Sequence, residues 1–216
     1  MTTAPHVTIV LIGKEPLPGR AKTRLHPPLS LEQAAALAAA SIDDTIETLA
    51  ASAASRLVLA WDGDALPPRS ESFAVMHQVP GSLDERLAAI FDACDGPTVL
   101  VGMDTPQLTS RELAPVFAPW PADSWFGPAN DGGFWALGMR EPDGSLIRGV
   151  PMSRADTGAL QRQRLADAGL TTAMLPRLTD VDTIDDAHEV ALSAPDTRFA
   201  RTLARFTARE HAKDAA

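Results

Sequence analysis

Cysteine, histidine ligand patterns and long apolar segments are scarce in this chain, and each absence excludes a kind of protein or site. One cysteine, Cys94, stands among 216 residues, which excludes an internal disulfide and a cysteine-based zinc site. The five histidines show no spacing typical of metal ligands. No apolar run approaches the roughly 20 residues that a membrane span needs. The N-terminus lacks a basic region followed by an apolar one, so we expect no signal peptide and a cytoplasmic protein.

Excess positive charge is also missing. The formal net charge is -9 and the isoelectric point is about 4.9. We therefore expect no nucleic-acid partner, because no long basic face is available to neutralise a phosphate backbone. A small anionic substrate stays compatible with this composition, since one local cationic pocket is enough to hold it. The chain has no nucleophile elbow, no P-loop and no Rossmann glycine fingerprint.

Positive charge is concentrated in one short segment, which directly follows an apolar run at 7–12 that predicts a buried first strand. Within eleven residues of this segment stand Lys14, Arg20, Lys22 and Arg24. Proline and glycine restrict and shape the loop, and backbone N–H groups together with fixed cations can hold phosphates. The segment predicts a site for an anion with several charges; the alternative is a surface loop with solvated charges.

Strand-like and helical patterns alternate along the chain and predict an α/β fold with a mixed, mostly parallel sheet covered on both faces. The predicted strands cover 7–12, 56–61, 73–76, 98–102, 124–127, 134–138 and 172–175. The predicted helices cover 30–54, 82–94, a segment capped by Thr109, 154–168 and a tail from about 184 to 213 with a break near Pro195. We expect residues 1–216 to form a single domain that includes this helical tail, and the strand at 98–102 to be central.

Acidic residues follow the predicted strands, where ligands bind in open α/β sheets. Asp104 comes just after the strand at 98–102 and suits a hard divalent cation; the alternative is a residue at a helix start. Asp182 is a candidate second ligand, although with Asp185 it also resembles the start of a helix. Asp180 is the alternative ligand, because alternation along an extended segment puts it on the same side as Asp182.

Two further groups are weaker candidates. Asn130–Gly133 is a tight turn, in which glycines permit positive φ. The two predicted strands that adjoin it suggest an antiparallel excursion around Asp131 in the mixed sheet. Arg86, in the first turn of the helix predicted at 82–94, offers an anion contact or is an ordinary surface arginine.

Five motifs in order, spread over about residues 7–190, resemble those of the uncharacterised bacterial GT-A-type glycosyltransferase-like proteins. They are Lys14-x-Pro16-x-Pro18-Gly19-x-x-Lys22-Thr23-Arg24-Leu25, Gly81-x-Leu83-x-Glu85-Arg86-Leu87, Asp104-Thr105-Pro106-x-Leu108, Gly127-Pro128-Ala129-x-Asp131-Gly132-Gly133 and Asp180-Val181-Asp182-Thr183. The segment from Arg20 to Ser30 and the late Asp-Val-Asp-Thr motif are also similar to the phospholactate and phosphoenolpyruvate guanylyltransferases of coenzyme F420 synthesis. Two departures concern the acceptor pocket: Met152 stands where the family usually has tryptophan, and no tyrosine stands near Phe134.

The resemblance implies a GT-A fold, which is a three-layer sandwich, a nucleotide or nucleotide-sugar substrate, and Mg²⁺ or Mn²⁺ as cofactor. It implies Asp104 and Asp182 as the metal ligands. The implied nucleotide-binding residues are Gly13, Lys14, Pro18, Gly19, Lys22, Thr23, Arg24 and Arg86. The implied substrate contacts are Asp131, Gly132 and Gly133, and the implied catalytic side chains are Lys22, Arg24 and Asp131.

Three functions follow as hypotheses. The first is nucleotidyl transfer from a nucleoside triphosphate to a small acceptor that bears a phosphate or carboxylate, with release of pyrophosphate; the density of cations in the first loop favours it. The second is glycosyl transfer from a nucleotide-sugar, which is weakened because Asp104 stands alone where many such enzymes carry an Asp-x-Asp pair. The third is a non-catalytic nucleotide-binding module.

Overall fold

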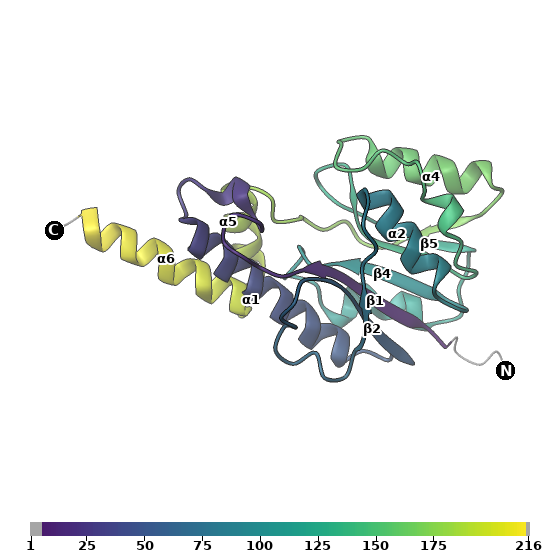
Figure 1. Cartoon of the computed structure of the whole chain (residues 1–216), viewed down its shortest axis with the longest axis horizontal. Coiled ribbons are helices and arrows are strands. Elements are labelled where there is room, and N and C mark those ends of the chain that lie inside the picture. The colour runs from purple at the N-terminus through teal and green to yellow at the C-terminus, as the bar shows by residue number, and fades with distance from the viewer. Residues whose placement is uncertain (1–5, 215–216) are drawn as a thin grey trace.

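A seven-stranded mixed sheet forms the middle layer of the fold (Figure 1). The computed structural model describes the backbone of residues 6–214 and the side chains as far as residue 208. The strands are β1 (Thr8–Lys14), β2 (Arg56–Asp62), β3 (Ala74–His77), β4 (Thr98–Gly102), β5 (Ser124–Pro128), β6 (Phe134–Met139) and β7 (Thr172–Met174). Their order across the sheet is β3-β2-β1-β4-β6-β5-β7, so β4 is the central strand, as predicted.

One strand runs against the others. β6 is antiparallel to both β4 and β5, and every other pair in the sheet is parallel. The predicted antiparallel excursion around Asp131 is therefore confirmed. Because β6 is reversed, the turn that precedes it lies at the same edge of the sheet as the carboxyl ends of β1 and β4. The chain also leaves β1 for β2 and β3 before it returns to β4, and such a reversal is where open α/β sheets bind ligands.

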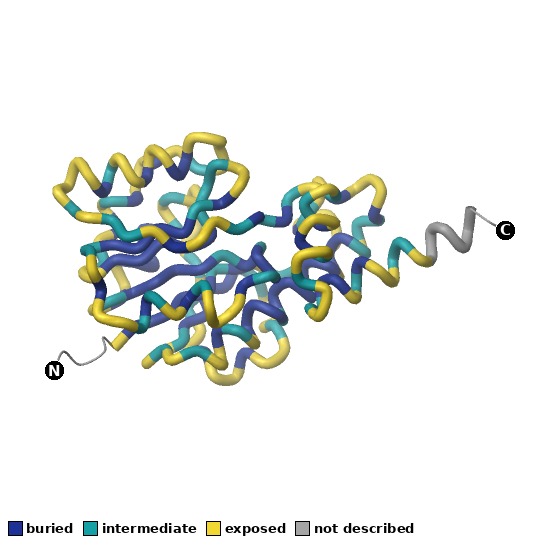
Figure 2. Tube along the Cα trace, turned by 180° about the vertical axis from the view of Figure 1, so that it is seen from behind, coloured by how far each residue is buried: buried dark blue, intermediate teal, exposed yellow. Residues whose placement is uncertain are grey.

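Helices cover both faces of the sheet. They are α1 (Leu31–Ala50), α2 (Leu83–Asp92), α3 (Ser110–Leu113), α4 (Thr157–Asp167), α5 (Ile184–Ser193) and α6 (Arg198–Asp214), with short 3-10 segments η1 (Thr23–Leu25), η2 (Ala114–Phe117) and η3 (Gly144–Leu146). α1 packs Ile42 and Ile46 against the sheet face that carries Leu11. α2 packs Phe91 against the other face, which carries Val10. The inner strands are thus buried on both sides, as Figure 2 shows along the sheet, whereas the edge strands β3 and β7 are partly exposed.

A third hydrophobic cluster lies outside the two sheet faces. It joins Leu25 and Leu29, at the end of the cationic loop, to Leu37 on α1 and to Phe199 and Leu203 on α6. All five side chains are buried. α6 therefore packs beside α1, and α5 packs against α6, so that both support the loop. The far end of α6 extends away from the body of the molecule (Figure 1).

The predicted elements are all present, and three helices differ in length from the prediction. α1 ends at Ala50, before the predicted end at 54, because the chain leaves the helix at Ala51. The helix that Thr109 caps ends after one turn, because Pro115 cannot continue its hydrogen bonding and the chain tightens into η2. The helix predicted from residue 154 begins at Thr157, because Ser153 adopts a left-handed backbone with a φ of 57°. The predicted break near Pro195 separates α5 from α6.

Candidate active site

Two neighbouring cavities open at the carboxyl edge of β1 and β4. The first, here the mixed cavity, has a volume of about 420 Å³ and is lined by apolar side chains together with Gln78 and Arg86. The second, here the charged cavity, has a volume of about 600 Å³ and is lined mainly by charged groups. Both cavities share a wall that consists of Lys14, Met103, Asp104, Asp131, Ser153, Arg154 and Asp182.

Lys22 lies in the wall of the charged cavity. Its ammonium Nζ lies 2.8 Å from Oδ1 of Asp104 and 3.2 Å from Oδ1 of Asp182, and it also donates to the backbone carbonyl of Val181. Its side chain is only 7% exposed. Burial alone would lower the pKa of Lys22, but the two carboxylates outweigh it and hold the pKa above its ordinary value. Lys22 is therefore a buried cation shared between the two predicted metal ligands.

Backbone contacts bring the two carboxylates together from distant parts of the chain. The Val181 N–H donates to the Asp104 carbonyl at 3.0 Å, which fixes the segment 180–182 against the end of β4. The helix start near Asp182 uses other residues: Thr183 is the N-cap of α5, and its side chain accepts from the Asp186 N–H. The Asp182 carboxylate instead faces Lys22 and, at 3.3 Å, Arg24. The alternative role of Asp182 as a capping residue is therefore wrong.

The chemistry of this pair fits a hard divalent cation that brings its own further ligands. Within the described residues, no group of three or more His, Cys, Asp or Glu side chains is arranged to hold a metal ion. Asp104 and Asp182, however, already direct an oxygen each at one cation, the Lys22 ammonium. Mg²⁺ commonly takes one or two protein carboxylates and completes its shell with water and substrate phosphates. The two aspartates could hold such an ion, together with phosphates.

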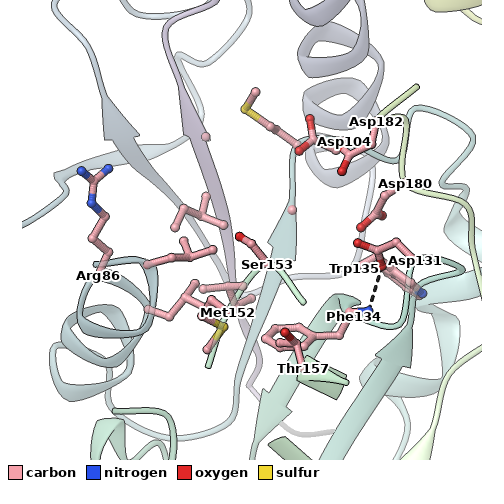
Figure 3. A pocket seen from close by; sticks show the side chains of 18 of the residues that line it. Arg86, Asp104, Asp131, Phe134, Trp135, Met152, Ser153, Thr157, Asp180 and Asp182 are labelled. Atoms are coloured by element: carbon pink, nitrogen blue, oxygen red, sulfur yellow. Dashed lines mark hydrogen bonds between the residues drawn. The ribbon is translucent and has the colours of Figure 1, made fainter. Parts of the chain in front are cut away.

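Asp180 is a third carboxyl group at the same place. Like Asp182 it lines the mixed cavity, as the alternation along this segment predicts. Figure 3 shows Asp180 beside Asp131, while Asp182 points toward Asp104. Burial, and then the negative charges of Asp104 and Asp131, raise the pKa of Asp180 to about 7. This group is therefore partly protonated near neutral pH.

The turn before β6 holds Asp131 in the wall between the cavities. Oδ1 of Asp131 accepts from the Gly133 N–H at 2.8 Å, which fixes the carboxylate on the turn. Gly132 has a φ of +89°, and a Cβ at this position would lie 1.9 Å from the Ala155 carbonyl oxygen. The Gly158 N–H donates to the Gly132 carbonyl at 2.8 Å, so the turn packs backbone against backbone on the start of α4. Glycine is required at 132 by space and by backbone conformation.

The mixed cavity contains two of the other predicted residues. Gly13 lies at the end of β1, where a Cβ would come within 2.9 Å of the Trp61 ring, and its carbonyl accepts from Gln78 at 2.7 Å. Arg86 lines the cavity from α2 (Figure 3), and its guanidinium pairs with Asp62 at 2.9 Å. Arg86 thus faces the site with a fixed orientation and is not a loose surface arginine.

The remaining predicted residues of the cationic loop form two groups. Some line the charged cavity, and the others set the course of the loop backbone. Lys14, Thr23 and Arg24 line the charged cavity, whereas Pro18 and Gly19 line neither cavity. Gly19 has a φ of 75°, and the turn that it shares with Pro18 directs the chain toward Lys22. These two residues determine the course of the loop.

Arg154 and Gln78 are polar residues of the site that the sequence predictions did not include. Arg154 lines both cavities and makes a two-fold hydrogen bond to Asp156, with both distances 2.9 Å. Gln78 follows β3, so the rule that placed Asp104 after its strand could have found it. The same rule could not find Arg154, because Arg154 lies at the start of a predicted helix and does not follow a predicted strand.

A protein-family model matches more than half of the chain. Residues 36–154 match the model of the DUF2064 family, described as an uncharacterized protein conserved in bacteria. No curated protein sequence matches the chain. Among the described helices, none is both long and apolar enough to cross a membrane.

Solved structures show the same fold. A candidate nucleotide-diphospho-sugar transferase from Desulfovibrio desulfuricans is 25% identical with a TM-score of 0.83, over 94% of this chain and 96% of that chain. The 2-C-methyl-D-erythritol 4-phosphate cytidylyltransferase of Thermus thermophilus is 13% identical with a TM-score of 0.53, over 89% and 99%. A mannosyltransferase from Pyrobaculum calidifontis, in complex with GDP-Man and Mn²⁺, is 11% identical with a TM-score of 0.50, over 83% and 57%. The predicted fold is confirmed, and the neighbours are transferases, the class of enzyme that was predicted.

Proposed function

The chain belongs to the bacterial DUF2064 family, and we propose that it is a nucleotidyltransferase that uses a nucleoside triphosphate and a small anionic acceptor. The observation that carries this proposal is the pair of adjoining cavities. One is partly apolar and suits a nucleoside, and the other carries Lys14, Arg20, Lys22 and Arg24 and suits a chain of phosphates. The phosphate chain would extend from one cavity into the other past Asp104, which lines both cavities.

In this reaction an oxygen of the acceptor phosphate or carboxylate attacks the α-phosphorus, and the bond to pyrophosphate breaks. The protein's contribution is position and charge. Arg24 and Lys22 hold the phosphates in line, and the fixed cations stabilise charge on the leaving pyrophosphate. Asp131, fixed on its turn, would contact the acceptor. A Mg²⁺ or Mn²⁺ ion held by Asp104 and Asp182 would act as a Lewis acid on the phosphates.

Glycosyl transfer from a nucleotide-sugar is the second candidate. Phe134, which is half-buried, lines the mixed cavity beside Asp131 and offers an apolar surface for a sugar ring. The name of the 25% identical neighbour favours this reaction. Against it stands the single acid after β4, because Gly102 and Pro106, two positions before and after Asp104, are not acidic.

A thermal-shift screen tests the proposal first. Nucleoside triphosphates and nucleotide-sugars are added one at a time, with and without Mg²⁺ or Mn²⁺, since a ligand that binds only the folded state raises the melting temperature. Metal-dependent stabilisation by a triphosphate, followed by pyrophosphate release with a phosphate-bearing acceptor, is the expected result. Stabilisation by nucleotide-sugars alone would replace the proposal with glycosyl transfer. No stabilisation by either class would refute both.

The Asp104→Asn variant sharpens this test. It keeps the shape of the side chain and removes its charge, so we expect the metal-dependent part of the triphosphate stabilisation to disappear. Asp95→Asn is the matched control, because Asp95 is exposed and lines neither cavity. Full activity of Asp104→Asn would contradict the metal assignment.

A further inference from the structure

The Lys22 ammonium pairs with both carboxylates that a divalent ion shared by Asp104 and Asp182 would need. Its Nζ is 2.8 Å from one carboxylate and 3.2 Å from the other. An ion bound by both oxygens would need metal–oxygen distances near ~2.1 Å. Because Nζ is 2.8 Å from the Asp104 oxygen, such an ion would lie within about 5 Å of Nζ, and two positive charges so close repel strongly.

Three oxygens already surround the ammonium: it forms ion pairs with two carboxylates and donates to one backbone carbonyl. A lysine ammonium has three N–H donors and no acceptor. In this protein they face the carboxylates of Asp104 and Asp182 and the carbonyl of Val181. To contact a nucleotide phosphate, Lys22 must release at least one of these oxygens.

The backbone at Lys22 supports a special position for this side chain. Lys22 has a φ of 49° and a ψ of 38°, the left-handed region that residues other than glycine seldom adopt. The side chain at this position is buried, whereas the two neighbouring arginines of the loop are exposed. Arg24 is 73% exposed, and Arg20 is exposed with no ion pair among the described residues.

We infer that Lys22 is a resident cation that competes with the divalent metal for Asp104 and Asp182, and that nucleotide phosphates draw it away so that the metal can bind. The second part of this inference, that nucleotide phosphates draw Lys22 away, rests on the proposed function. Its first part, the competition, rests on the ion pairs alone. The two aspartates would then bind a metal poorly until a polyphosphate is present.

The test is a calorimetric titration of Mn²⁺ into nucleotide-free protein, which reads metal binding and not activity. We expect the Lys22→Met variant, which keeps the length of the side chain, to bind Mn²⁺ at least tenfold more tightly than the natural protein. Arg20→Met is the matched control, because it removes one positive charge from the same loop without touching either carboxylate. We expect it to change the affinity less than threefold at physiological salt, where exposed charges are screened.

Equal gains in Lys22→Met and Arg20→Met, or weaker Mn²⁺ binding by Lys22→Met, would overturn the inference. If Lys22→Met does not fold, Lys22→Gln replaces it, because glutamine keeps a donor for the Val181 carbonyl. Failure of the proposed function gives a different pattern. A protein that binds no nucleotide, but gains Mn²⁺ affinity in Lys22→Met, would refute nucleotidyl transfer and support the competition.

Discussion

Substitution of Gly132 by alanine tests whether the turn that holds Asp131 depends on close backbone packing. Two costs are expected. The first is conformational, because a φ of +89° is unfavourable for an alanine by about 1 kcal/mol. The second is steric, because the added Cβ would lie 1.9 Å from the Ala155 carbonyl oxygen and real contacts are at least 3.0 Å. The backbone near Ala155 must move, at an overpacking cost of about 1–3 kcal/mol.

Gly149→Ala separates the two costs. Gly149 has a φ of +83°, almost the same as Gly132, but a Cβ there meets no atom within 4 Å. Urea unfolding should therefore show that Gly132→Ala loses about 1–3 kcal/mol more than Gly149→Ala, with similar slopes for both. Equal losses would refute the steric argument. The nucleotide-induced rise in melting temperature should also fall in Gly132→Ala alone, because only this substitution displaces the wall of both cavities.

Two further substitutions test contacts away from the site by urea unfolding. Asp44→Ala should cost about 2–4 kcal/mol, because this buried carboxylate accepts from two backbone N–H groups at the start of α6 and from the Arg198 guanidinium; a loss no larger than that of Asp95→Ala would contradict this. Asp92→Asn should cost about 1 kcal/mol at pH 7, because Asp92 and Arg148 form a half-exposed pair at 2.7 Å. The hydrogen bond from Arg148 lowers the pKa of Asp92, so its stabilisation is present above the unfolded pKa and is lost as pH falls through the folded one. The deficit of Asp92→Asn should therefore shrink below about pH 4, and a deficit that stays constant to about pH 3 would be evidence against this contact.

The fold could be predicted from the sequence because apolar runs and capping residues mark the same strands and helices that the structure contains. The apolar run after residue 7 forms β1, the Ser30 capping box opens α1, and the strand at 98–102 is central. The rule that ligands bind after the carboxyl ends of strands predicted that Lys14 and Asp104 lie at one edge of the sheet. The same rule worked for Asp131 because β6 is reversed, which the paired strands around the turn had indicated.

Contacts between distant residues could not be predicted in the same way. Nothing in the sequence near Lys22 shows that its partners lie about 80 and 160 positions away, because ion pairs depend on how the chain returns to the sheet edge. Arg154 was missed for a local reason. The left-handed Ser153 delays the start of α4, which leaves Arg154 in a loop that faces the site.

The third hydrophobic cluster determines how late the site can form while the chain is synthesised on the ribosome. The two clusters on the sheet faces are complete within residues 7–175, apart from the half-buried Leu178 at their margin. The cluster behind the cationic loop, in contrast, needs Val181, Val190, Phe199 and Leu203. Domains begin to fold while synthesis continues at about 5–20 residues per second. The sheet can therefore form first, and the loop acquires its supports and Lys22 its partner Asp182 only after the segment from 181 onward has emerged. A nascent chain that stalls before this point would hold a nearly complete sheet without a working site.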